Sequence, residues 1–134
     1  AAALAAVKRS DAQLQRIRSA CDRMQAATTA EEMVAPDVEF HLALIDAANS
    51  ELLIPFGIII EQALQQMFDY TSRHNPKPLD VVPLHRAVTQ AIADKSPDAA
   101  SKAVMELLKD TDEVIAAGPT PQRPPAKAIA RRAR

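Results

Sequence analysis

The chain has 134 residues, of which 48% are hydrophobic, and its formal net charge is −1 at neutral pH. This content suffices for one soluble domain with a core, and no apolar run approaches the roughly 18 residues that cross a bilayer. The alanine-rich N-terminus reaches Lys8 and Arg9 within a few residues and has no preceding basic segment, so it does not resemble a signal peptide. Cys21 is the only cysteine, which excludes an internal disulfide and fits a reducing compartment. We therefore expect a cytoplasmic protein with no membrane partner.

The net charge hides an asymmetry between the body of the chain and its C-terminus. Residues 119–134 hold five basic residues, four prolines and no acidic residue, which leaves a net charge of −6 on residues 1–118. We expect residues 1–118 to form the folded domain and residues 119–134 to be a Pro-rich, basic, disordered tail. Because the tail has no interleaved aromatic side chains, solvation is favoured over more than weak contact with nucleic acid.

The pattern of the folded part is that of an all-α protein with about six helices. Two glycines are too few for a sheet protein with many tight turns, and no segment shows sustained alternation of apolar and polar residues. Ser10, with Gln13 three residues later, matches a capping box and predicts a helix over residues 10–27.

A short helical turn and then a long helix are predicted next. Two threonines at the start of 28–35 each precede a glutamate by three residues, which is a capping pattern for a short turn. Because proline suits the first turn of a helix, the long helix should begin at Pro36 and stop near Asn49.

The following helix carries the most apolar stretch, residues 52–60, and should run to about Tyr70 with a kink at Pro55. We expect it to be the most buried helix. The segment 72–78 is interrupted by prolines and reads as a loop that leaves His74 in solvent.

Two more helices complete the folded part. The first carries His85, and Val88, Ala91 and Ile92 recur at helical spacing from it, so the imidazole should face inward. The second begins at the strong start signal of 96–98 and should end near Ala117. Its inward stripe is predicted to be Ala100, Ala103, Val104, Leu107, Leu108 and Ile115.

Asp37 and His41 are the pair with the clearest chemical meaning. Four residues separate them, so one helical turn places both on the same face, which also carries Leu44, Ile45 and Ala48. A buried carboxylate needs a partner, and a metal or a ligand cation is one. The alternative is that Asp37 stabilises the start of its helix with His41 as a neutral hydrogen-bond partner.

The order and spacing of several motifs resemble those of a known family, the FadR C-terminal domain (FCD) of GntR-type regulators. The motifs are Asp37-x-x-Phe40-His41-x-x-Leu44, then Ala47-Ala48-Asn49 with Leu52, then His85-x-x-Val88-x-x-Ala91-Ile92. The resemblance implies an antiparallel helical bundle that senses a small carboxylate and controls a winged-helix DNA reader. Many members also hold a divalent metal in the bundle.

By this resemblance, Asp37, His41 and His85 match three of the four metal ligands of the family. The fourth family ligand is a histidine in the last helix, and Leu107 stands at its position. Three protein ligands completed by water or effector oxygens are a chemically reasonable site for zinc, nickel, manganese or iron.

The resemblance also implies partners. The family's DNA reader lies before this domain and is absent from the chain, so DNA contact would come only through that missing N-terminal domain. The chain has no initiator methionine, which favours a fragment of a longer regulator. Regulators of this family form homodimers that read paired half-sites.

The leading hypothesis is therefore a ligand-sensing regulatory domain with no enzymatic activity. Gln62, Gln66 and Arg73 lie on or just after the apolar helix and are candidates to contact an effector carboxylate. One alternative is a metal-dependent enzyme, because two histidines and one carboxylate are also the ligands of non-haem iron oxygenases. Another is a helical dimerisation bundle whose site has decayed, for which Leu107 is the main support.

Overall fold

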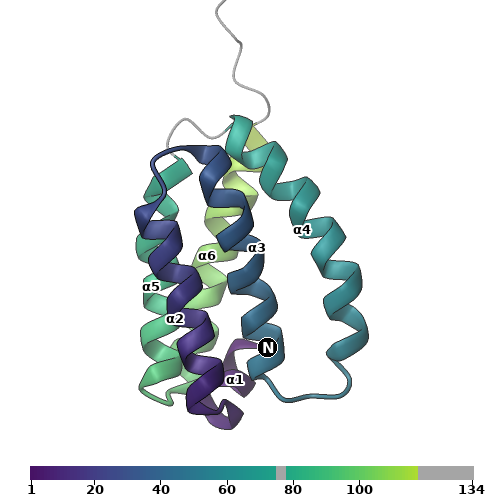
Figure 1. The fold of residues 1–134 in the computed structure, drawn as a ribbon, viewed down its shortest axis with the longest axis vertical. Coiled ribbons are helices and arrows are strands. Elements are labelled where there is room, and N and C mark those ends of the chain that lie inside the picture. Colours follow the sequence, from purple (N-terminus) through teal and green to yellow (C-terminus); the bar gives the residue numbers. More distant parts are fainter. Residues whose placement is uncertain (75–77, 118–134) are drawn as a thin grey trace, which may run out of the picture.

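The computed structural model describes residues 1–74 and 78–117, and these residues form an all-α bundle without strands, as predicted (Figure 1). The helices are α1 (Ala2–Lys8), α2 (Asp11–Ala26), α3 (Ala30–Ala47), α4 (Ile54–His74), α5 (Val82–Ala93) and α6 (Pro97–Ala117), with a 3-10 turn, η1 (Pro78–Val81), before α5. None of these helices combines the length and the apolar character that a bilayer crossing requires. The predicted tail lies outside the described residues.

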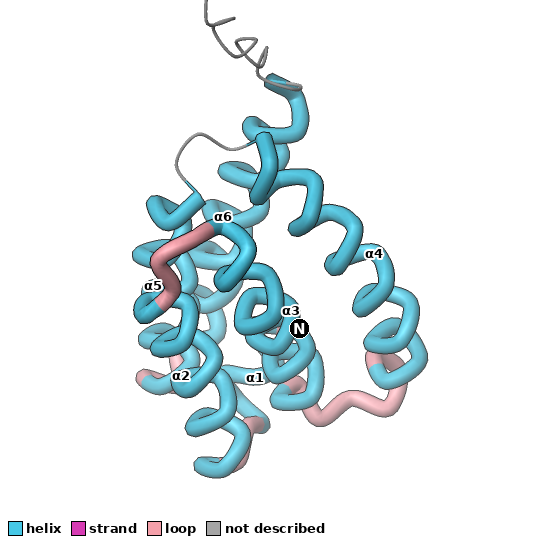
Figure 2. Tube along the Cα trace, turned by 45° about the horizontal axis from the view of Figure 1, so that its top comes forward, coloured by secondary structure: helices cyan, strands magenta, loops and turns pink. Residues whose placement is uncertain are grey.

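The helices pack as antiparallel neighbours around one core. Helix α3 lies between α2 and α4, while α5 packs against both α2 and α6, and the short α1 closes one end against α6. Figure 2 shows α4 at the edge of the bundle, beside α3. The largest fully buried side chains lie on α2, α3, α5 and α6, and they include Phe40, Ile17, Met24, Ile92 and Leu107.

Helix α3 starts earlier than predicted. Thr29 caps it by accepting a hydrogen bond from the Glu32 backbone, and the Glu32 carboxylate accepts hydrogen bonds from Thr28. The predicted short turn and the next helix are therefore one helix, and Pro36 lies buried inside it rather than at its start. The capping at Thr29 and the packing of α3 outweigh the backbone hydrogen bond that proline removes.

Helix α4 is not the most buried helix, contrary to the prediction. Large apolar side chains in and just before its first half are exposed, and within residues 1–74 and 78–117 only α3 packs extensively against it. Pro55 occupies the second position of the helix, where the missing N–H has no intrahelical partner, so it is a start rather than a kink. The helix continues to His74, so residues 72–74 of the predicted loop are helical, and Pro78 begins the 3-10 turn η1. Residues 75–77 lie outside the described residues.

The predicted boundaries of α2 and α6 agree with the structure. Ser10 and Gln13 form the full capping box at the start of α2, and α6 runs to Ala117. The inward stripe of α6 is shorter than predicted, because Leu108 and Ile115 are about two-fifths exposed (43% and 42%) whereas Leu107 is buried.

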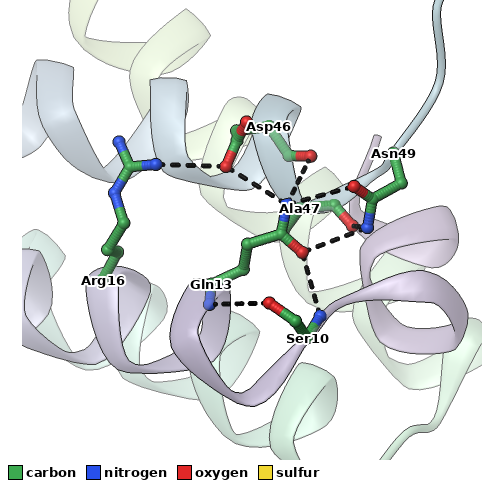
Figure 3. A network of polar contacts seen from close by, with 6 residues as sticks. All are labelled: Ser10, Gln13, Arg16, Asp46, Ala47 and Asn49. Carbon is green, nitrogen blue, oxygen red and sulfur yellow. Dashed lines mark hydrogen bonds and ion pairs between the residues drawn. The ribbon is translucent and has the colours of Figure 1, made fainter.

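A polar network fixes the end of α3 against α1 and α2 (Figure 3). The backbone of Asn49 has φ = 43°, the left-handed conformation that asparagine tolerates after a helix end. Its side-chain Nδ2 donates to the Lys8 carbonyl oxygen at 2.9 Å and to Gln13 Oε1 at 3.0 Å. Gln13 and Arg16 also donate to Asp46 Oδ2. This junction sets the register of α3 against α2.

Candidate metal centre

Asp37 and His41 lie one turn apart on α3 and both point into the bundle. Asp37 is the eighth residue of α3, well past the first turn, so the reading of this carboxylate as a helix-start group is wrong. Its side chain and that of His41 are 12% and 14% exposed. The pair therefore sits at the edge of the core rather than on the surface.

His85 joins this pair from α5. Its side chain is 2% exposed, and its Nε2 lies 2.9 Å from Asp37 Oδ1, across 48 residues of sequence. His41 Nε2 lies 3.5 Å from the same oxygen. The structure thus brings together Asp37, His41 and His85, the three residues that the sequence singled out.

Phe40 holds both imidazoles in place. Its ring is fully buried and meets the His41 and His85 rings edge to face, with centroid distances of 5.5 and 4.8 Å. The two imidazoles are also edge to face with each other, at 5.7 Å. The sequence motif contained Phe40, but its role between the rings depends on packing that spacing does not show.

The tautomer of His85 follows from its second contact. The Val81 carbonyl oxygen only accepts, so His85 donates its Nδ1–H to it across 3.1 Å. A neutral His85 then turns the lone pair of Nε2 toward the Asp37 carboxylate. Two acceptors 2.9 Å apart need a proton or a metal cation between them, so proton and metal compete for this position.

The electrostatics of Asp37 favour its ionised form. Burial by itself would raise the pKa of Asp37, but hydrogen bonds with His41 and His85 and the charge of both imidazoles lower that pKa below its usual value. The carboxylate is therefore available as a ligand in the folded protein.

This lowered pKa predicts a specific acid sensitivity of the metal-free protein. The pKa of Asp37 is lower in the folded state than its value of about 3.9 in an unfolded chain, so the carboxylate stabilises the fold above about pH 4. That contribution is lost as the pH falls through the folded-state pKa. Urea unfolding with chelator present, from about pH 7 down to about pH 3, should show a smaller loss of stability for Asp37→Asn than for the wild type. Equal losses would contradict the pairing.

The three side chains fit a divalent metal. Ligand atoms about 2.0–2.2 Å from a metal are about 2.8–3.6 Å apart at neighbouring coordination positions. The distances of 2.9 and 3.5 Å from Asp37 Oδ1 fall in this range, and the three ligand atoms all lie within 4.8 Å of one another. Two imidazoles and a carboxylate suit zinc, nickel, iron or manganese.

Leu107 lies on α6, the helix that follows α5, at about the same height along the bundle axis as His85. Helices α5 and α6 form a hairpin, and His85 is eight residues before the end of α5 while Leu107 is ten residues after the start of α6. At a rise of 1.5 Å per residue, the two positions differ by about 3 Å along the helix axes. Leu107 is 2% exposed and belongs to the core. A site built on the triad therefore keeps open positions for non-protein ligands.

The other predicted contacts, Gln62, Gln66 and Arg73, all belong to α4. Gln62 and Gln66 are exposed on α4, and the side chain of Arg73 is outside the described part of that helix. Their role as effector contacts stays a prediction. The Val81 carbonyl oxygen, which orients His85, was not predicted, because a backbone acceptor leaves no signal in the sequence.

Comparison with known families agrees with this geometry. The FCD domain model matches residues 1–110, which include α1 to α5, the triad and Leu107. No curated protein matches the chain in sequence. An all-α bundle is also the fold of this family. The chain therefore belongs to the FCD family, the regulatory effector-binding domains of GntR-type regulators.

Proposed function

We propose that this chain is the sensing domain of a GntR-type transcriptional regulator and that it binds a small carboxylate through a divalent metal. Asp37, His41 and His85 would hold the metal. The observation that carries the proposal is their convergence at the edge of a helical core, with all three ligand atoms within 4.8 Å. The metal would supply a Lewis-acidic centre for the oxygens of the effector.

The site is placed to connect two parts of the bundle. Asp37 and His41 belong to α3, whereas His85 belongs to α5 and is tied through Val81 to the junction with η1. A ligand that binds one relative position of α3 and α5 more tightly shifts the domain toward that packing. In the full regulator, this shift would report to a winged-helix DNA reader.

We also propose how the domain contacts DNA, in which oligomeric state it acts and in which compartment it works. DNA would be contacted only through the N-terminal reader, the regulator would act as a homodimer, and it would work in the cytoplasm. The FCD match supports this setting. Residues 1–118 would form the domain and residues 119–134 a basic tail.

A metal-dependent enzyme is the second candidate, because two histidines and one carboxylate with open positions also bind iron in oxygenases. The surroundings of the triad favour sensing instead. Two contacts of the triad, the Phe40 ring and the Val81 carbonyl oxygen, position the imidazoles and supply neither a nucleophile nor a general base. We therefore propose that the domain is not an enzyme.

Calorimetric titration tests the sensing role. A panel of mono-, di- and tricarboxylates would be titrated into zinc-loaded protein, into chelator-stripped protein and into zinc-treated Asp37→Ala. We expect at least one carboxylate to bind the loaded wild type and none to bind the other two samples as tightly, because its oxygens need the metal. Equal binding in all three would mean that side chains alone recognise the effector. No binding anywhere would favour a decayed site.

A further inference from the structure

A groove between α2 and α5 carries basic side chains that the proposed function does not use. The two helices pack side by side (Figure 1), and the groove has a volume of about 580 Å³, the size of a small-molecule site. Its walls include Arg18 and Asp22 of α2 and Arg86 of α5. Arg86 follows His85 in sequence but contacts α2, whereas the His85 ring contacts α3. The groove and the metal triad therefore lie on different sides of α5.

Arg18 brings an unpaired cation to this α2–α5 groove. Its side chain is exposed, and within residues 1–74 and 78–117 it has no hydrogen bond or ion pair. The neighbouring arginines of α2 differ, because Arg16 pairs with Asp46 and Arg23 pairs with Glu39. All five N–H donors of the Arg18 guanidinium are thus available to a ligand in the groove.

Arg86 reaches the same groove from the other helix. Its Nε donates to Gln25 Oε1 at 3.2 Å, and its Nη2 lies 3.5 Å from Asp22 Oδ1. The contact with Asp22 is long, and the two side chains are 51% and 70% exposed, so this ion pair is weak. The two contacts orient the guanidinium and use two of its five N–H donors. With two arginines and one aspartate, the walls of the groove carry a net charge of +1.

The floor of the groove is polar and uncharged. Cys21 and Thr89 form it, and both residues are buried. The thiol hydrogen-bonds to the Thr89 hydroxyl, which in turn donates to the His85 carbonyl oxygen at 2.9 Å. Burial raises the pKa of the Cys21 thiol, so the thiol stays neutral near pH 7. An anion in the groove would therefore meet two cations on the walls and no opposing charge on the floor.

Two guanidinium groups on separate helices suit a phosphate group better than a carboxylate. A carboxylate has one charge and two oxygens, which a single bidentate arginine satisfies. A phosphate monoester carries a charge of about −1.5 to −2 near pH 7 and has three acceptor oxygens, so it can accept from two arginines at once.

We infer that the α2–α5 groove binds a phosphate group between Arg18 and Arg86, either as the free ion or as the head of a small phosphorylated metabolite. The inference goes beyond the proposed function and depends on neither the metal nor the carboxylate effector. A ligand here bridges α2 and α5, and α5 also carries His85. The domain would thus have a second ligand input.

Calorimetric titration at constant ionic strength tests the groove. Inorganic phosphate, glycerol phosphate and acetate would be titrated into protein that has been stripped with chelator and desalted, so that no metal competes for the anions. Arg18→Gln and Arg86→Gln should each weaken phosphate binding by about 10-fold or more, because each removes charge-assisted hydrogen bonds. Asp22→Asn should instead tighten it by about 3-fold, because Arg86 loses a competing carboxylate.

Arg16→Gln is the matched control, because it removes the same charge from the same helix and Arg16 is not part of the groove walls. It should bind phosphate within about 2-fold of the wild type. The variants change exposed side chains, so all should keep the wild-type melting temperature. Tighter binding of glycerol phosphate than of inorganic phosphate would identify a phosphorylated metabolite, and equal binding would identify the free ion.

Three results would overturn the inference. They are no binding up to about 10 mM phosphate, equal losses in Arg16→Gln and Arg18→Gln, and acetate binding as tight as that of phosphate. A titration of Asp37→Ala separates the groove from the metal triad. This variant should bind phosphate like the wild type, and a loss there would assign the anion to the triad instead.

Discussion

Asp37→Ala and His85→Ala are each expected to abolish metal binding by the purified protein. Wild-type protein loaded with zinc, nickel, manganese or iron should carry about one metal ion per chain, and plasma mass spectrometry after desalting measures it. Each variant removes one of three ligands and leaves the other two without the geometry for tight binding. Metal at about 100 times its dissociation constant stabilises the native state by about 2.7 kcal/mol, so a chelator should lower the melting temperature of the wild type by roughly 10 °C.

Glu39→Ala provides the matched control for this experiment. Glu39 is a carboxylate on the same helix, two residues from Asp37, but it is half-exposed and pairs with Arg23. This variant should keep both the metal and the response to chelator. If Asp37→Ala and Glu39→Ala hold equal amounts of metal, then the triad is not the site. If the wild type holds none and gains no stability from added metal, the site has decayed.

Features that depend on neighbouring residues were predictable from the sequence. The capping box at Ser10 was correct because both of its hydrogen bonds join residues three positions apart. The shared face of Asp37 and His41 was correct because helical spacing alone determines it. His85 was placed on an inward face by the same periodicity, but spacing alone does not show that this face meets Asp37. That pairing followed only from the resemblance to the FCD family.

The errors concern features that tertiary packing decides. The rule that proline starts helices misplaced the beginning of α3, because the Thr29 cap and the burial of Pro36 override it. The apolar stretch of α4 predicted burial, yet among the described helices only α3 packs extensively against α4, and side chains of this stretch stay exposed.

Leu107→His is expected to complete the site with a fourth ligand. The residue lies at the depth of His85 on the adjacent helix, and its side chain already points into the core. Without metal, a buried imidazole in place of leucine should lower the free energy of unfolding by about 2–4 kcal/mol. With metal bound, the new ligand should tighten binding by more than about 10-fold, which competition with a chromogenic chelator measures.

The opposite signs of these two effects separate a completed site from simple damage to the core. Leu108→His is the control, because Leu108 is the next residue of α6 and is 43% exposed. It should change neither the metal affinity nor, by more than about 0.5 kcal/mol, the stability. If both variants bind metal equally, position 107 is not the fourth position. If only Leu107→His gains affinity, then Leu107 in the natural chain is what keeps a coordination position open to an effector.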